Sequence, residues 1–235
     1  LPDPSIDPSE GEEPADHFNT VLYTGNNSTN NITGVGFQPD WVWVKNRNGT
    51  QNHYLQDSVR GASNYLVTNN TGAENQYSGL GSSAFTSFDS DGFSVTSDSS
   101  IGMVNSSSST YVAWNWLAGG SASSNSDGDI TSSVSANTKA GFSIVTYTGT
   151  GSAATIGHGL SAAPEFIIVK NRDAAYNWPT YHKDYTSAAY SIFLDNNAAQ
   201  TTNSTLAKFF NSTDPTSSVF SVGTSNSYSN SSSDD

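Results

Sequence analysis

One hydrophobic stretch occurs twice in this chain of 235 residues, and it constrains the fold more than any other feature. The first copy is residues 40–47 (DWVWVKNR), the second is residues 165–172 (EFIIVKNR), and a proline precedes each. Runs of β-branched and aromatic residues that end in a turn-prone KNR favour β-strands. Because apolar residues occupy both faces, with Trp41 and Trp43 on one of them, we expect a central strand covered on both sides, as in a β-sandwich.

Other landmarks recur in the same order and at nearly the same spacing. Residues 142–149 repeat the pattern of residues 18–25, and the FSV of residues 220–222 repeats that of residues 93–95. Such recurrence predicts an internal duplication. The short strands are separated by Gly, Ser and Asn turns and show no helical period, which favours antiparallel sheets. The sequence therefore predicts an all-β fold with two tandem antiparallel β-sandwich domains.

Composition divides the chain into four parts. Residues 1–17 hold four of the eight prolines and six acidic residues, which predicts an extended, solvated arm, with an acidic docking arm as the alternative. Residues 18–118 form the first repeat. Residues 119–139 are rich in Gly, Ser and Asn and predict a linker, and residues 140–235 form the second repeat.

The two repeats end differently. In the first, a serine-rich loop at residues 105–110 leads into the alternating strand of residues 111–116 (YVAWNW). In the second, the equivalent loop at residues 225–233 leads directly to Asp234 and Asp235. We therefore expect the second sandwich to lack its last strand. Either the polypeptide is longer than these residues, or another chain donates the strand.

Composition also argues against several classes of function. The formal net charge of −13, with 8 Lys and Arg residues, disfavours binding to nucleic acid or to an anionic membrane surface. No apolar run approaches the length of a membrane helix. The absence of cysteine excludes disulfides, thiol catalysis and zinc–thiolate sites. A surface of Ser, Thr, Asn and Gly, with only 12% charged residues overall, suits β structure outside the cytosol.

Few residues are candidates for catalysis or for metal binding. Asp89 and Asp91 lie in a DSDG sequence that resembles the start of a calcium loop, but no Glu follows to complete a cage, so we expect a hairpin turn with calcium as the alternative. The histidines form no repeated arrangement with a nucleophile and a carboxylate. Beyond the arm the glutamates are Glu74 and Glu165, which do not suggest the paired carboxylates of a glycosidase. We assign no catalytic residue and no other cofactor.

Aromatic residues are the stronger indication of function. Exposed rings can stack on sugars or anchor a protein interface, but packing in a core is the more common role for any single one of them. The candidates are Tyr54, Trp114, Trp116, Tyr176, Trp178 and Tyr181.

Several motifs in combination resemble a repeat of structural proteins from tailed bacteriophages, especially marine ones. They are residues 36–47 (GFQPDWVWVKNR), 57–61 (DSVRG), 87–93 (SFDSDGF) and 111–116 (YVAWNW), with a sister version at residues 178–183 (WPTYHK) and 215–220 (PTSSVF). The resemblance covers nearly everything after residue 17. It implies a lectin-like sandwich of the jelly-roll or concanavalin type in a virion component, a tail fibre or a capsid appendage. It brings no catalytic residues.

Together these observations predict a non-enzymatic structural protein at the virion surface. The expected partners are other capsid or tail proteins, further copies of the chain in a symmetric oligomer, and a host surface polysaccharide. Nucleic acid and membrane are not expected as partners. The alternative is a carbohydrate-binding module for host attachment, or a glycan-cleaving enzyme, on the same fold.

Overall fold

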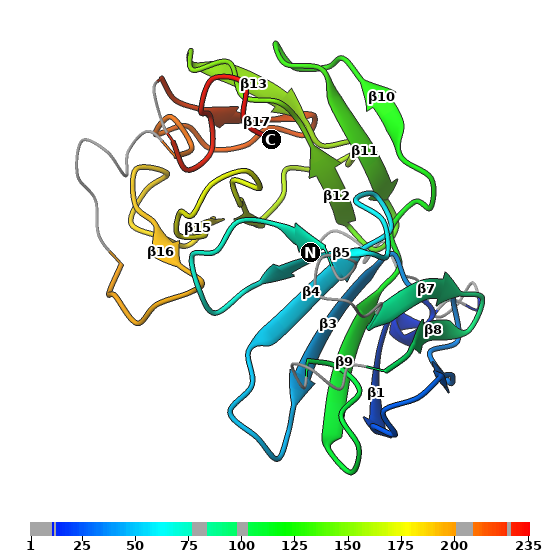
Figure 1. Ribbon diagram of the computed structural model, residues 1–235. Helices are drawn as coiled ribbons and strands as arrows, with labels where there is room; N and C mark the ends of the chain where they lie inside the picture. The colour runs from blue at the N-terminus through cyan, green and yellow to red at the C-terminus, as the bar shows by residue number, and fades with distance from the viewer. Residues whose placement is uncertain (1–10, 12, 77–83, 98–102, 201–208, 225–226) are drawn as a thin grey trace. The chain divides into compact units, whose positions relative to one another are not determined.

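In the computed structural model, the regular secondary structure is almost entirely β-strand, arranged in several antiparallel sheets that long loops connect (Figure 1). The residues that it describes are 11, 13–76, 84–97, 103–200, 209–224 and 227–235. Within them the helical element is the three-residue 3-10 helix η2 (Pro14–Asp16). The all-β class is therefore confirmed. Most of the predicted arm, residues 1–10 and 12, lies outside the described residues.

The chain divides into two compact units. The first unit comprises Leu1–Val67 and Glu74–Ser121, and the second comprises Thr68–Ala73 and Ala122–Asp235. A short loop from the first half of the sequence thus belongs to the second unit.

The first unit contains a six-stranded sheet in the order β1-β9-β3-β4-β5-β6. Its strands are β1 (Phe18–Thr24), β3 (Trp41–Asn46), β4 (His53–Asp57), β5 (Asn64–Val67), β6 (Asn75–Gln76) and β9 (Thr110–Trp116). A three-stranded sheet in the order β2-β8-β7 consists of β2 (Asn30–Ile32), β7 (Phe85–Asp89) and β8 (Gly92–Val95). The late strand β9 lies between the early strands β1 and β3, and this insertion closes the large sheet.

Strand β3 lies inside the six-stranded sheet, as predicted for the first copy of the repeated stretch. Val42 and Val44 are fully buried in a core that also contains Phe85 and Phe93 of the three-stranded sheet. The tryptophans of β3 point to the opposite face and remain partly exposed. The expectation that both faces would be covered is therefore only half right, because one face of the strand keeps contact with solvent.

An Asp-Gly turn joins β7 to β8, and the predicted hairpin is confirmed. The register pairs Asp89 with Gly92. Gly92 has a φ of 150°, and a Cβ atom there would lie 2.0 Å from the carbonyl oxygen of Ile32. A glycine is thus needed for the close approach of the turn to β2.

The second unit contains three small sheets. Their orders are β10-β11-β12, β13-β17 and β14-β15-β16. The strands are β10 (Ser123–Asn125), β11 (Ser132–Asn137), β12 (Phe142–Thr146), β13 (Ala154–Gly157), β14 (Phe166–Ile168), β15 (Pro179–His182), β16 (Ile192–Phe193) and β17 (Val219–Val222). Their core includes Val169, Tyr181, Phe209, Phe210 and Phe220.

The predicted linker of residues 119–139 is wrong, because it contains two strands. Strands β10 and β11 lie within it, and residues 133–137 of β11 pair with β12. Val134 of β11 is buried. Serine-rich sequences suggested a flexible segment, but serines alternate with apolar residues here, and pairing to β12 satisfies their main-chain groups.

The second copy of the repeated stretch is not a central strand. It forms β14, a three-residue strand at one edge of the β14-β15-β16 sheet, and Phe166 at its start is 50% exposed. A strand becomes central through its neighbours. In the first unit β9 lies beside β3, whereas no strand among the described residues lies beside β14 on that edge.

Each unit contains a buried asparagine that joins three segments of main chain. The Nδ2 atom of Asn105 donates to two carbonyl oxygens and its Oδ1 atom accepts from one main-chain N–H, the partners being Ser28, Thr96 and Asn26. Asn230 bonds in the same way to Ser152, Gly223 and Thr150. In both units a tyrosine hydroxyl donates to the carbonyl just before the asparagine, Tyr23 to Val104 and Tyr147 to Ser229.

Candidate functional site

Aromatic side chains from three adjacent strands meet on one face of the six-stranded sheet. Residues directly opposite each other in antiparallel strands point to the same face. The register aligns Phe18 with Trp116 and Trp116 with Trp41, and one layer further along it aligns Trp114 with Trp43. We call this surface, together with the neighbouring Leu22 and Val112, the outer aromatic face.

The outer aromatic face is accessible, whereas the opposite face of the same strands is not. Phe18 is 39% exposed and Leu22 is 62% exposed. The four tryptophans, two on β3 and two on β9, are partly exposed. Tyr111 and Ala113 of β9, which point to the opposite face from Trp114 and Trp116, are 0% exposed. Alternation along each strand therefore divides the apolar residues into a core set and a surface set.

The rings of the outer aromatic face contact one another in pairs. The ring centroids of Phe18 and Trp116 are 4.7 Å apart, and those of Trp43 and Trp114 are 5.9 Å apart at an interplanar angle of 62°. The indole N–H of Trp43 is buried and, within the described part of the chain, bonds to no acceptor. Such paired rings form a preorganised apolar surface on rigid strands, which suits a stacked sugar or the core of a protein interface.

Two basic residues, Lys45 and His53, border this face and form a polar row. Lys45 pairs with His53 on one side and with Val112 of the face on the other. The Lys45 ammonium donates to the carbonyl oxygens of Asn46 and Gly49. Burial, and then the charge of Lys45, lower the pKa of His53 below its usual value of 6.5. His53 is therefore predominantly neutral at pH 7, and Lys45 is the cation of this row.

Two of the six aromatic candidates belong to the accessible surface described above, and the others do not. Trp114 and Trp116 lie on the outer aromatic face. Tyr54 is buried in the core against Tyr65, so the prediction of an accessible ring is wrong there. We did not predict from the sequence that Phe18, Leu22, Trp41 and Trp43 belong to the site. The period-2 alternation of β1, β3 and β9, combined with their pairing, would have identified them.

The candidates of the second unit serve its packing. Trp178 is 2% exposed and its indole N–H donates to the carbonyl oxygen of Asn70 at 2.9 Å. Tyr181 is buried, and its hydroxyl donates to Asp214; burial and this bond raise the pKa of Tyr181 to about 12. Tyr176 is partly buried against Tyr228, with 5.0 Å between the ring centroids. None of these three forms an accessible platform with another.

Lys170 lies under the Trp178 ring, with Nζ 5.8 Å from the ring centroid. Its ammonium donates to three carbonyl oxygens, those of Thr71, Ala174 and Tyr176. Burial lowers the pKa of Lys170 to about 8, although the charge of Asp195 opposes the shift. Lys170 and Trp178 together hold the loop Thr68–Ala73 in the second unit.

The carboxylates of the DSDG turn are used by the protein itself. Asp91 accepts hydrogen bonds from the N–H groups of Gly36 and Gly34, and these bonds lower the pKa of Asp91. Asp89 accepts from the hydroxyls of Ser87 and Ser94. In the described ranges, no three His, Cys, Asp or Glu residues are grouped so that they could hold a metal ion.

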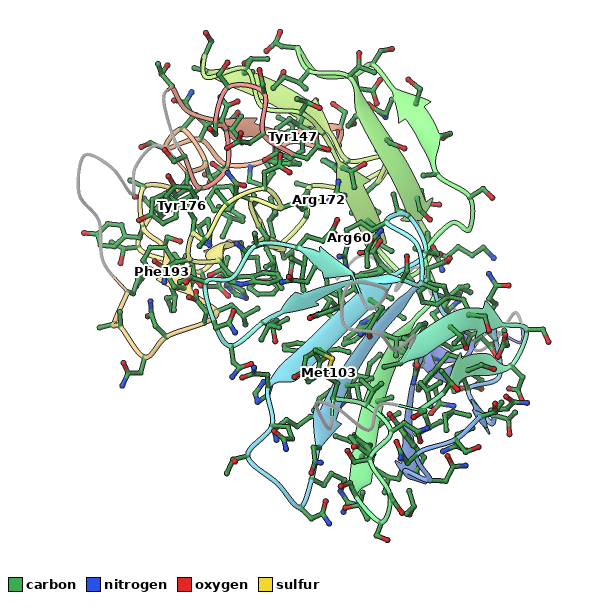
Figure 2. All side chains as sticks on the ribbon, viewed as in Figure 1. Arg60, Met103, Tyr147, Arg172, Tyr176 and Phe193 are labelled. Atoms are coloured by element: carbon green, nitrogen blue, oxygen red, sulfur yellow. The ribbon has the colours of Figure 1, made fainter. Side chains whose placement is uncertain are left out.

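The glutamates considered above are ion-paired. Glu74 accepts from Arg60, which Figure 2 labels, at 2.6 Å, and the same guanidinium donates to Asp57 at 2.5 Å. This cluster is almost fully buried and fixes the turn after β4. Glu165 forms an exposed ion pair with Lys183. In the described part of the chain, no helix is long and apolar enough to cross a membrane.

The structure thus defines an all-β protein whose largest sheet buries one face and presents aromatic residues on the other. The chain belongs to the family described as Domain of unknown function (DUF7483), whose model matches residues 13–235. No curated protein and no solved structure matches the chain.

Proposed function

We propose that this chain is a non-enzymatic structural protein of a bacteriophage particle, in a capsid appendage or tail fibre, and that it binds a neighbouring virion protein through the outer aromatic face. The observation that carries the binding role is the set of four tryptophans and one phenylalanine that share one accessible face of a rigid sheet. The virion assignment rests on the resemblance of the motifs to phage structural repeats.

Aromatic residues dominate the energetics of protein interfaces. Tryptophan is enriched among residues whose truncation weakens binding by 2 kcal/mol or more, and contiguous apolar patches on a monomer generally mark interaction sites. The low proportion of charged residues, 12%, also suits a surface that becomes buried in an assembly.

The finer description of the fold belongs to the same proposal. We take the two units to be tandem sandwiches of jelly-roll or concanavalin type that arose by duplication. The matching bonds of Asn105 and Asn230 support this relation, as do those of Tyr23 and Tyr147.

A second candidate function is attachment to a host polysaccharide. The partly exposed indole rings of Trp43, Trp114 and Trp116 favour it, since sugar rings stack on such surfaces. A glycan-cleaving enzyme on this fold would need paired carboxylates, and the outer aromatic face as defined contains none.

Incorporation into particles tests the main proposal. Phage particles made with the variant Trp114→Ala/Trp116→Ala should contain at least about tenfold less of this protein by mass spectrometry, because losing two anchors costs more than 1.4 kcal/mol. The control is Phe166→Ala, an exposed aromatic residue of the second unit. Absence of the parent protein from purified particles would end the virion proposal. Glycan-array binding that the double variant abolishes, with incorporation unchanged, would favour host attachment instead.

A further inference from the structure

The outer aromatic face has a basic end. Lys45 lies two residues after Trp43 on the same side of β3, and the register places it opposite Val112 of β9. The N–H of Arg47 donates to the carbonyl oxygen of Thr110 at 2.7 Å, which continues the pairing of β3 with β9 by one residue. Because side chains alternate along a strand, Arg47 extends from the same side as Lys45, and it is exposed.

The guanidinium of Arg47 differs from those of the other arginines in its partners. Arg60 pairs with two carboxylates, and Arg172, which has the position of Arg47 in the second copy of the repeated stretch, pairs with one (Figure 2 labels Arg60 and Arg172). The described residues provide no ion-pair partner for the side chain of Arg47. A planar group that can bind a carboxylate through two parallel N–H bonds is therefore available at this end of the face.

The charge of this end is opposite to that of the chain as a whole. The chain has 21 Asp and Glu residues and 8 Lys and Arg residues. On the outward side of β1, β9 and β3, however, the register places Lys45 and then Arg47, and no carboxylate. Positive charge beside partly exposed indole rings attracts a ligand that carries carboxylates next to apolar groups.

The ring pairs of the face are tilted, not coplanar. The interplanar angle is 62° between Trp43 and Trp114, and 52° between Phe18 and Trp116. Coplanar rings would suit the successive sugar rings of a polysaccharide. Tilted rings present the face of one ring beside the edge of the other, which suits a proline or a branched side chain of a polypeptide.

We propose that the neighbouring virion protein binds the outer aromatic face through an extended acidic segment. Carboxylates of the segment pair with Arg47 and Lys45, and its apolar residues contact Trp43 and Trp114. This inference rests on the proposed function, because it names the chemistry of the partner. The two can fail separately. Absence of the protein from particles contradicts the proposed function alone, whereas protein that is incorporated but does not bind acidic segments contradicts this inference alone.

A synthetic peptide of alternating proline and glutamate, about 12 residues long, is the probe, added to the full chain. Proline keeps the peptide extended and packs well on aromatic rings. We expect saturable binding that weakens at least about tenfold when the ionic strength rises from about 0.05 M to about 0.5 M, because salt screens exposed charges. Matched peptides with glutamine or lysine in place of glutamate should bind at least about tenfold more weakly than the glutamate peptide.

Charge variants locate the binding site. Lys45→Gln/Arg47→Gln should weaken binding of the glutamate peptide at least about tenfold. The control Arg172→Gln/Lys183→Gln removes the same charge from the second unit, where both cations already pair with carboxylates, and it should bind like the parent. Arg47→Glu should bind the lysine peptide more tightly than the parent does, a gain that an unfolded variant would not show.

Several outcomes would overturn the proposal. Equal losses in the two glutamine double variants would show that the peptide is attracted non-specifically by charge. A lack of saturable binding, or binding that Trp114→Ala/Trp116→Ala leaves unchanged, would show that the outer aromatic face does not hold the segment. Binding of a polyuronate oligosaccharide but not of the peptide, weakened by Arg47→Gln, would identify an acidic polysaccharide as the ligand instead.

Discussion

At the scale of single residues, the two copies of the repeated stretch use their first acidic residue in different ways. Asp40 is 1% exposed and has hydrogen-bond donors, not a cation, as its partners: the N–H groups of Ala118 and Gly120 and the hydroxyl of Ser58. Its counterpart Glu165 is exposed and pairs with Lys183. The same sequence position is therefore a buried structural anchor in one unit and a surface ion pair in the other.

Replacement of Asp40 by alanine should destabilise the first unit by about 3 kcal/mol, because it removes the acceptor of three hydrogen bonds, which come from the buried N–H of Ala118, the part-buried N–H of Gly120 and the hydroxyl of Ser58. The matched variant Glu165→Ala should change the free energy of unfolding by no more than about 0.5 kcal/mol, as expected for an exposed pair. Urea denaturation of both variants measures the difference. Equal effects would contradict the role assigned to the Asp40 carboxylate.

His158 should make the stability of the second unit depend on pH. Its Nδ1 atom accepts from the N–H of Leu160 and its Nε2–H donates to Thr216, so the folded unit holds the neutral ring. Burial lowers the pKa of His158, although the Thr216 bond and the charge of Asp127 oppose the shift. Because the folded pKa lies below the unfolded value of 6.5, the stability that depends on neutral His158 is present above pH 6.5 and falls as the pH drops below it.

Unfolding free energies measured between pH 8 and pH 5 test this prediction. The decline below pH 6.5 should be shallower in His158→Gln than in the parent, whereas the exposed control His182→Gln should keep the parental slope. A parental slope in His158→Gln would show that other groups cause the decline.

At the scale of secondary-structure elements, local pattern predicted the strands, whereas their positions in the sheets depend on partners. Residues 41–46 and 166–168 both form strands, as their β-branched and aromatic residues indicated. Only the first became interior, because β9 from 65 or more residues later pairs with it, and no local pattern contains that pairing. Strands β10 and β11 were missed for a related reason, since serine-rich segments become strands through pairing with β12.

The same limit applies to the candidate site. Alternation in residues 111–116 correctly placed Trp114 and Trp116 on one face. The contribution of Phe18 depends on its pairing with Trp116, across most of the first unit. Tyr54, Trp178 and Tyr181 were indistinguishable from surface aromatics by sequence, because burial is decided by tertiary packing.

Val169→Asp should unfold the second unit. Val169 is 8% exposed and belongs to its core, and an unpaired buried carboxylate costs several kcal/mol against a total stability of about 5 to 15 kcal/mol. Phe166→Asp, three residues earlier on the exposed edge, should melt close to the parent. Thermal melts followed by near-ultraviolet circular dichroism give the comparison, and a parental melt for Val169→Asp would mean that this core tolerates the charge.

At the scale of the whole molecule, the chain divides into two compact units that share some local features and differ in their strands. Each unit has a buried asparagine with matching main-chain bonds, Asn105 or Asn230, and a glycine whose N–H donates to a distant main-chain carbonyl, Gly25 or Gly149. Only the first unit, among the described residues, has a strand such as β9 between its early strands. The sequence predicted two units, yet it could not predict that the loop Thr68–Ala73 would belong to the second. The bonds of Asn70 and Thr71 to Trp178 and Lys170 decide this, and they join segments far apart in sequence.

The position of β9 in the sequence also determines when β1 can find its pairing partner during synthesis. The side chain of Asn115 in β9 donates to the carbonyl of Asn19 in β1, 96 residues earlier in the sequence. At roughly 5 to 20 residues per second, the ribosome needs about 5 to 20 s to produce the partner that β1 requires. During that interval β1 and β3 have no β9 between them, and their apolar side chains are open to other contacts. We therefore expect the first unit to depend on chaperones while it is being made. Protease digestion of stalled nascent chains should show that β1 and β3 stay sensitive to cleavage until β9 has been synthesised.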